Sequence, residues 1–180
     1  MKYFNREIWA GWQTKDWKRW DTIAKMKWKR YEKQLSRLKN RINPKYWGFF
    51  IDHKKYNLHD GRIASIKIVD KFESRRLEKK SWKSVHHITD PTMVEIHAFD
   101  ASMKYLYLIK YDSVRRIHYD FPSDNPLFFS SGQGMGDWGY DELVAAGHKY
   151  LKHEILFASG TTLLIEFKGF SFTRKKLTRH

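Results

Sequence analysis

Apolar and polar positions follow two different periods along this chain of 180 residues. In residues 6–42 apolar positions recur every three or four residues, which predicts an amphipathic helix. The predicted helix is interrupted near Gly11, and Asn5 and Thr14 are its candidate N-caps. Asn43-Pro44 is predicted to end it, because the residue before a proline disfavours the α region. The apolar stripe contains Trp17, Trp20, Ala24, Trp28, Tyr31, Leu35, Leu38 and Ile42.

After this helix, short β-prone runs replace the helical period. Strands are predicted over residues 46–51, 62–69, 93–99, 104–110 and 114–121. Residues 70–84 are strongly charged and are predicted to form a strand end followed by an exposed loop or a short helix. Residues 122–138 are the longest predicted loop, because they are rich in Pro, Gly, Ser and Asn. Residues 141–150 are predicted to form a short helix.

Residues 153–172 carry the most distinctive apolar pattern. Two β-prone runs flank Ser159-Gly160, and a two-residue connection with Gly is typical of a hairpin. If Ala158 pairs with Thr161, apolar side chains occupy both faces of the hairpin, because successive side chains alternate. We therefore expect the hairpin to lie centrally in a sheet that is covered on both sides. In this register His153 lies opposite Glu166.

These elements predict a single α+β domain. A long N-terminal amphipathic helix (residues 1–43) is expected to lie across one face of an antiparallel β-sheet or partly open barrel. The sheet is expected to have about six or seven strands within residues 44–173, since a helix and a sheet must bury their apolar sides against each other. Residues 174–180 are predicted to be a basic tail.

The bulk properties of the chain favour a cytoplasmic protein. No apolar run has the length of a membrane span, and residues 1–7 lack the layout of a secretory signal. The chain has no cysteine, which excludes disulfides and thiolate metal sites. Its net charge is +15, and ten of these charges fall within residues 1–45, which hold fourteen Lys and Arg against four Asp and Glu.

The concentration of positive charge suggests an interaction with a polyanion. Cations interleaved with aromatic residues can follow a phosphate backbone and stack on bases, so one hypothesis is a nucleic-acid contact. The alternative is a solvated face of an amphipathic helix whose Trp side chains fix it to the sheet. Attachment to a membrane surface by the same helix is a third, less favoured interpretation. The cations on the side opposite the apolar stripe are Lys15, Arg19, Lys29, Arg30, Lys33 and Arg37.

Two polar motifs are candidates for catalysis. His59 beside Asp60 could act as a general base with an orienting carboxylate. Adjacent strand residues point to opposite faces, however, so the pair requires a turn to redirect one of them; otherwise Asp60 only shapes an Asp-Gly turn. Asp141 and Glu142 could divide acid and base roles or bind a hard cation. Otherwise they cap and complete the first turn of a helix.

His153 has both a structural and a functional interpretation. As the cross-strand partner of Glu166 it would stabilise the hairpin. In a cleft it could instead titrate near neutral pH.

We expect no metal and no cofactor. His86, His87 and Asp90 form a candidate metal cluster, but neighbouring histidines cannot easily share one ion on a regular element, and no second cluster supplies a ligand spacing such as H-x-x-x-H. His153-Glu154 would open a zinc-protease motif, but Phe157 occupies the position of its second histidine. The glycines of residues 132–136 lack the Lys-Ser/Thr that follows a phosphate-binding loop.

Three segments together resemble a bacterial family of roughly two-hundred-residue proteins known only as a domain of unknown function. Related Leu-His-Asp motifs also occur in small proteins grouped with the immunity proteins of toxin systems. The resemblance implies a bacterial protein with a β-rich core, and it brings no catalytic residue. It is carried by Met1-Lys-Tyr-Phe with Trp12-Gln13, by Leu58-His-Asp-Gly-Arg-Ile63, and by Asp141-Glu142 with His153-Glu-Ile-Leu-Phe157 and Leu164-Ile-Glu-Phe167.

Three functions from different classes follow. The favoured one is a non-enzymatic, immunity-like module that binds a protein partner, for which the positive charge indicates an acidic surface. The second is a weak nucleic-acid-binding protein that uses the basic helix. The third is a hydrolase-like enzyme, which requires that His59 and Asp141 converge in one pocket.

Overall fold

The computed structural model describes residues 1–70, 92–121 and 135–178. Its helices are α1 (Arg6–Trp12), α2 (Trp17–Ser36), the 3-10 helix η1 (Lys39–Arg41) and α3 (Pro44–Ile51). Asn5 caps α1 as predicted, since its side chain accepts a hydrogen bond from the N–H of Ile8. The predicted interruption separates α1 from α2, and Asp16 rather than Thr14 occupies the N-cap position of α2.

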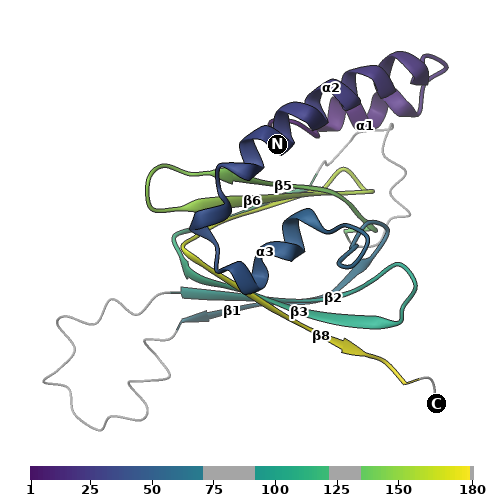
Figure 1. The fold of residues 1–180 in the computed structure, drawn as a ribbon. Coiled ribbons are helices and arrows are strands. Elements are labelled where there is room, and N and C mark those ends of the chain that lie inside the picture. The colour runs from purple at the N-terminus through teal and green to yellow at the C-terminus, as the bar shows by residue number, and fades with distance from the viewer. Residues whose placement is uncertain (71–91, 122–134, 179–180) are drawn as a thin grey trace, which may run out of the picture.

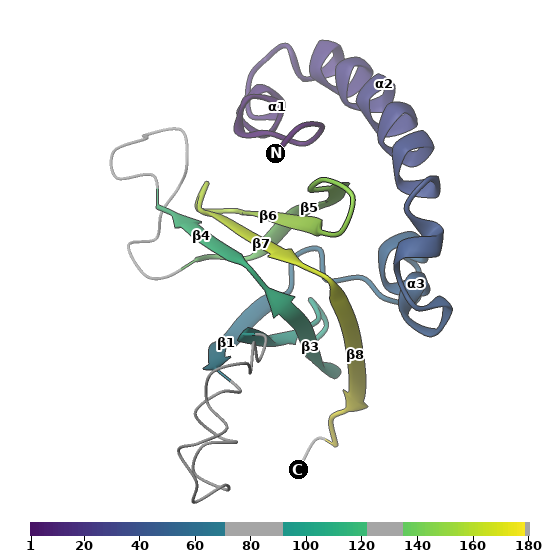
Figure 2. The same cartoon turned by 90° about the vertical axis from the view of Figure 1, so that its left-hand side faces the viewer.

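The strands form two antiparallel sheets of four strands each, which confirms the α+β class. In the first sheet the order is β1 (Arg62–Asp70), β2 (Thr92–Phe99), β3 (Tyr105–Val114) and β8 (Gly169–Lys176). In the second sheet the order is β4 (Arg116–Asp120), β7 (Thr162–Phe167), β6 (Leu151–Phe157) and β5 (Trp138–Ala145). Within the described residues the sheets do not close into a barrel, and they face each other as two layers (Figures 1 and 2).

Two segments pass directly from one sheet to the other. β3 continues into β4 through Arg115, and β7 continues into β8 through Lys168. Backbone hydrogen bonds hold both corners, one from Arg115 N to the Glu166 carbonyl (3.0 Å) and one from Lys168 N to the Asp112 carbonyl (3.0 Å). The paired bends turn one continuous antiparallel ladder into two layers with a shared apolar interior.

The core lies between the layers, and α3 fills the side where they open. Inward-facing residues of both sheets, such as Ile96, Ile109 and Ile165, are fully buried. On α3, the rings of Phe49 and Phe50 lie 5.2 and 4.7 Å from the ring of Phe170 on β8. Residues of α3 therefore complete the core where neither sheet covers it (Figure 1).

The long helix α2 packs on the second sheet, as predicted, but along its edge strand β5 rather than across its face. The hydroxyl of Tyr31 accepts a hydrogen bond from the backbone N–H of Leu143 on β5 (2.9 Å). The N-terminal part of α2 packs on α1, where Gly11 leaves room for the ring of Trp20. Trp17, predicted to belong to the apolar stripe, is 51% exposed because it precedes the part of α2 that reaches the sheet.

The β6–β7 hairpin occupies the centre of its sheet, as predicted, but its register differs by one residue. Ile155 pairs with Leu163 and His153 with Ile165, so the predicted His153–Glu166 pair is wrong. The physical reason is the turn, which contains three residues and ends with Gly160 at φ +78°. The slip places Ile165 rather than Glu166 opposite His153, whose side chain is fully buried.

Three other predicted elements are wrong. Residues 46–51 are helical because Asn43 and Pro44 begin a helix: the Asn43 side chain accepts from the N–H of Lys45, and a proline suits the first helical position. Residues 141–145 belong to β5 instead of a helix. Residues 174–176, predicted as tail, continue β8. The predictions for residues 71–84, for most of the 122–138 loop and for His86, His87 and Asp90 lie outside the described residues.

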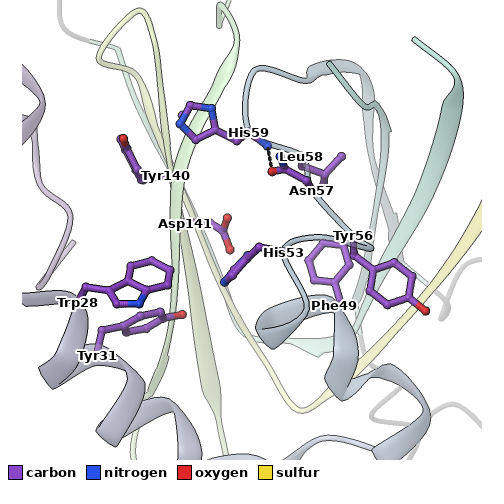
Figure 3. A pocket seen from close by; sticks show the side chains of 11 residues that line it. Trp28, Tyr31, Phe49, His53, Tyr56, Asn57, Leu58, His59, Tyr140 and Asp141 are labelled. Carbon is purple, nitrogen blue, oxygen red and sulfur yellow. Dashed lines mark hydrogen bonds between the residues drawn. The ribbon is translucent and has the colours of Figure 1, made fainter. Parts of the chain in front are cut away.

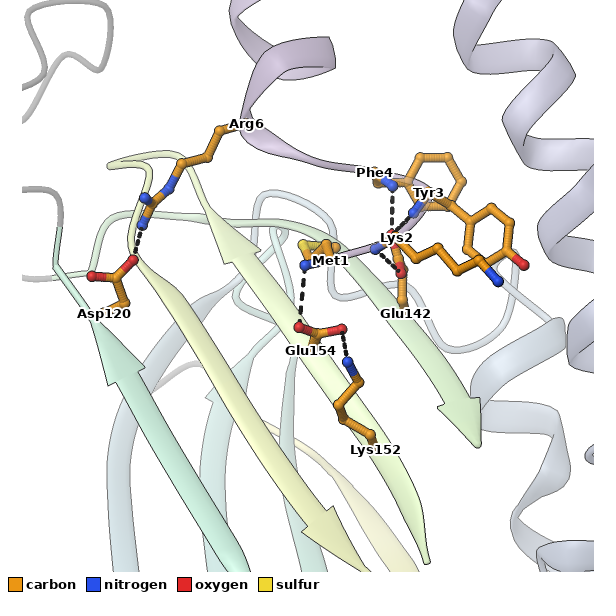
Figure 4. Close-up of polar contacts among 9 residues, drawn as sticks. All are labelled: Met1, Lys2, Tyr3, Phe4, Arg6, Asp120, Glu142, Lys152 and Glu154. Carbon is orange, nitrogen blue, oxygen red and sulfur yellow. Dashed lines mark hydrogen bonds and ion pairs between the residues drawn. The ribbon is translucent and has the colours of Figure 1, made fainter. Parts of the chain in front are cut away.

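The N-terminal residues cover the outer face of the second sheet (Figure 4). Glu142, which is fully buried, accepts hydrogen bonds from the backbone N–H groups of Lys2, Tyr3 and Phe4 at 2.8, 2.6 and 2.5 Å. Farther along, Arg6 pairs with Asp120 at the end of β4 (2.7 Å). The central hairpin is therefore covered on both sides, as predicted.

Candidate ligand-binding site

Asp141 is held in a fixed orientation by a bulge in β5. The pairing of β5 with β6 shifts between Trp138 and Tyr140, so Gly139 is an extra residue in the strand. A side chain at Gly139 would lie 2.8 Å from the carbonyl oxygen of Leu156, which explains the glycine. Because of the extra residue, Trp138 and Asp141 share the inner face, and Trp138 Nε1 donates to Asp141 Oδ1 (3.2 Å).

Behind Asp141 lies a buried hydrogen-bonded chain. The imidazole of His153 has no exposed surface; its Nε2 lies 3.0 Å from Asp141 Oδ2 and its Nδ1 lies 2.7 Å from the hydroxyl of Tyr111. Burial, followed by the charge of Asp141, raises the pKa of Tyr111 well above its usual value, so this hydroxyl keeps its proton. Together, the Tyr111 hydroxyl and the Asp141 carboxylate engage both ring nitrogens of His153 in hydrogen bonds.

The Asp141 carboxylate is an anion at neutral pH. Burial alone would raise its pKa, but hydrogen bonds from His153 and Trp138 favour the charged form and lower the pKa below its usual value. Within the described residues neither Lys nor Arg forms an ion pair with it. About a quarter of its side chain (26%) remains exposed. A very basic protein thus presents a fixed negative charge that the described lysines and arginines leave accessible.

That charge lies in a cavity of about 370 Å³ between α2, the segment after α3, and β5 (Figure 3). Its size and its mainly aromatic lining with few polar groups are typical of small-ligand sites. A second, more apolar cavity of about 300 Å³ adjoins it and shares Trp28, Tyr31 and His53. The residues that line the first cavity are Trp28, Tyr31, Phe49, His53, Tyr56, Asn57, Leu58, His59, Gly139, Tyr140 and Asp141.

Two histidines lie in the cavity wall. His53 follows α3 and is exposed. Its ring centroid lies 5.6 Å from that of Trp28 in a tilted arrangement, and its imidazole lies near Asp141 (Figure 3). His59 packs edge-on against Tyr140, with ring centroids 5.2 Å apart. Both rings therefore border the same space as the partly exposed carboxylate of Asp141.

The turn that carries His59 is tied to β5. Asp60 N donates to the Trp138 carbonyl (2.8 Å) and Trp138 N donates to the Gly61 carbonyl (2.7 Å). Asp60 adopts φ +61°, and this left-handed conformation brings its carboxylate to 3.0 Å from His59 Nδ1. The turn thus brings the two side chains together, which is the condition for His59 to act as a general base oriented by Asp60. The backbone bonds place His59 next to β5.

The structure brings together some of the predicted site residues and separates others. His59 and Asp141 line one cavity, which satisfies the condition set for the hydrolase hypothesis. Glu142 points to the opposite face of β5 and holds the N-terminal segment, so it does not pair with Asp141. His153 lies behind Asp141 without access to the cavity. Glu166, its expected partner, pairs with Arg115 at 2.7 Å.

The predicted polyanion-binding residues are all exposed. They lie on α2 or at its ends, on the side away from β5; they are Lys15, Arg19, Lys29, Arg30, Lys33 and Arg37.

Sequence reasoning missed His53, Tyr111 and the cavity role of Trp28 and Tyr31. Asn43-Pro44 was the available signal for His53, since a helix starting there would have placed the imidazole just beyond its end. No local signal exists for Tyr111, which reaches His153 from the other sheet. Among the described residues no group of three or more His, Asp or Glu side chains is arranged to hold a metal ion. None of the described helices is long and apolar enough to cross a membrane.

Comparisons with models of protein families, with curated proteins and with solved structures found no match. The resemblance to a bacterial family of unknown function therefore stays a prediction.

Proposed function

We propose that this protein is a non-enzymatic binding module whose cavity receives a positively charged group from its ligand. The observation that carries the proposal is the Asp141 carboxylate, which is fixed by two hydrogen bonds, lines the cavity and is not paired with a Lys or Arg among the described residues. An ammonium or guanidinium group would supply the missing partner.

The walls suit the same kind of ligand. Trp28, Tyr31, Phe49, Tyr56 and Tyr140 border the cavity. The faces of aromatic rings attract cations, by about 0.5–1 kcal/mol at exposed sites and about 2 kcal/mol when the pair is desolvated. An aromatic enclosure with one carboxylate favours an organic cation over a hydrated metal ion. The cation can belong to a small molecule or to a Lys or Arg side chain of a partner protein.

Calorimetric titration tests the proposal with two kinds of probe. Benzyltrimethylammonium represents a small-molecule ligand, and pentapeptides with a central Lys or Arg represent a protein partner. We expect saturable binding of at least one probe with a Kd below about 1 mM, equivalent to about −4 kcal/mol. Tighter binding of the peptides would indicate a protein partner, and tighter binding of the free cation a small molecule.

Three variants make the test specific. Asp141→Asn should weaken binding at least tenfold, a loss of about 1.4 kcal/mol. Asp60→Asn is the matched control, because it removes an exposed carboxylate from the same region and asparagine tolerates the left-handed conformation. His53→Lys changes an exposed residue and places a tethered ammonium near Asp141, so it should also abolish binding, even if Asp141→Asn proves unstable. Unchanged affinity in His53→Lys, or no binding to the wild-type protein, would contradict the proposal.

Hydrolysis by acid–base catalysis is a second candidate, favoured by one observation: two imidazoles border the same cavity as Asp141. His59, oriented by Asp60, would act as the general base. Turnover of p-nitrophenyl acetate or bis-p-nitrophenyl phosphate above the buffer rate, reduced about 100-fold or more in His59→Ala, would support it. Rates equal to buffer would rule these substrate classes out.

A further inference from the structure

One side of α2 is a continuous basic surface, separate from the cavity. Its solvent-exposed positions hold cations along the whole helix together with Thr22, Ser36 and Met26, and Met26, which is 53% exposed, is the apolar residue among them. Glu32 borders this side and accepts a hydrogen bond from Trp28 Nε1 at 2.8 Å. We call this surface the basic face of α2; it consists of Lys18, Arg19, Lys25, Lys29, Arg30, Lys33 and Arg37.

The structure fixes which side of α2 faces solvent. Ala24, Tyr31 and Leu35 are buried on the opposite side, and the bond from Leu143 N to the Tyr31 hydroxyl holds the helix against β5. Residues spaced three or four apart lie on one face of a helix, so Lys25, Lys29 and Lys33 form one row. With 20 residues in α2, the face extends about 30 Å at 1.5 Å per residue.

Most of these charges are not neutralised within the protein. Lys25 pairs with Asp21 at 2.7 Å, and Arg19 approaches Asp16 at 3.8 Å. In the described part of the chain, no ion pair is found for the remaining members of the face: Lys18, Lys29, Arg30, Lys33 and Arg37. A rigid row of unneutralised cations about 30 Å long is matched by a partner with regularly repeated negative charge.

We propose that the basic face of α2 binds the phosphate backbone of a nucleic acid, without base-specific contacts. Arginine and lysine are the residues that neutralise phosphates, and such binding releases counterions. A membrane surface is less suitable, because an interfacial helix inserts an apolar face, and most of that of α2 is covered by α1 and β5. An acidic protein is less suitable because protein interfaces have an apolar centre depleted of charge, whereas this face offers only Met26. This surface is independent of the cavity ligand.

The test is fluorescence anisotropy with a labelled 20-base-pair DNA duplex and a single-stranded RNA of 20 nucleotides, at several salt concentrations. We expect affinity to fall steeply with salt, with a log–log slope of about −0.9 per duplex phosphate contacted and about −0.7 for a single strand. The variant Lys29→Glu/Lys33→Glu/Arg37→Glu should bind at least tenfold more weakly, and its duplex slope should be less steep by about 2.7.

A charge-matched control separates a defined surface from net charge. Lys67→Glu/Lys175→Glu/Lys176→Glu reverses three exposed lysines of the first sheet and gives the same net charge as the α2 variant. We expect it to keep at least a third of the wild-type affinity. Equal losses in both variants would overturn the proposal, as would wild-type binding that does not depend on salt. Binding to anionic vesicles or polyglutamate that exceeds binding to both nucleic acids would also overturn it in favour of another polyanion.

Discussion

Replacing Glu142 by Gln tests how the N-terminal segment is held against the second sheet. The carboxylate has no exposed surface; its Oε1 accepts from the N–H groups of Tyr3 and Phe4 and its Oε2 from that of Lys2. Glutamine keeps one acceptor oxygen, but its amide nitrogen would face the N–H of Lys2, so two donors would meet.

The magnitude follows from these three bonds. A hydrogen bond to a charged group contributes about 1.5–3 kcal/mol and a neutral one about 0.5–1.5 kcal/mol. The substitution removes one charged bond and weakens two, while a neutral side chain costs less to bury than a carboxylate. We expect a net loss of about 2–3 kcal/mol in the free energy of unfolding. For a chain of this length the melting temperature should fall by about 4–12 °C.

Urea unfolding and amide hydrogen exchange measure both parts of this prediction. The amides of Lys2, Tyr3 and Phe4 should exchange faster in the variant, since their acceptors are changed. Glu7→Gln is the control, because Glu7 is exposed and its loss should stay within about 0.5 kcal/mol. If Glu142→Gln matched the control in stability and in exchange at these amides, Glu142 would not anchor the segment.

Three further predictions concern the site. Gly139→Ala should lower stability by about 1–3 kcal/mol, because its methyl group would lie 2.8 Å from the Leu156 carbonyl oxygen; unaltered urea unfolding would refute the need for the bulge. Tyr111→Phe should cost about 1–3 kcal/mol by leaving Nδ1 of His153 buried without a hydrogen-bond partner, and an unchanged stability would mean that the hydroxyl is dispensable. The lowered pKa of Asp141 stabilises the fold above the unfolded value of about 3.9, and this contribution is lost as pH falls through the folded pKa. Asp141→Asn should therefore show a shallower loss of stability below about pH 4, whereas parallel profiles would contradict the assigned shift.

The fold class and the central hairpin could be predicted from the sequence because both depend on apolar periodicity. The register of the hairpin could not be, since Ser159-Gly160 suits a two-residue turn as well as the last two positions of a three-residue turn. Residues 46–51 were assigned the wrong type because their aromatic run is β-prone, and Asn43-Pro44 was interpreted as the end of one helix rather than the start of the next.

The candidate site was only partly predictable. Asp141 and His59 can be singled out from the sequence as polar residues in motifs. Their common cavity, however, depends on backbone hydrogen bonds between residues 60–61 and Trp138, and no local sequence pattern predicts these bonds. The role of Glu142 depends on three backbone groups at the other end of the chain. The sequence of residues 141–145 resembles the start of a capped helix. These residues nevertheless form part of strand β5, because long-range partners of this kind override local propensity.

A crystal structure of the protein with benzyltrimethylammonium is the most direct test of the cavity. We expect the quaternary nitrogen beside the Asp141 carboxylate and within about 6 Å of at least two of the aromatic ring centroids that line the cavity. A structure with an empty cavity, or with the cation bound elsewhere on the protein at saturating concentration, would contradict the proposal that Asp141 receives a positively charged group.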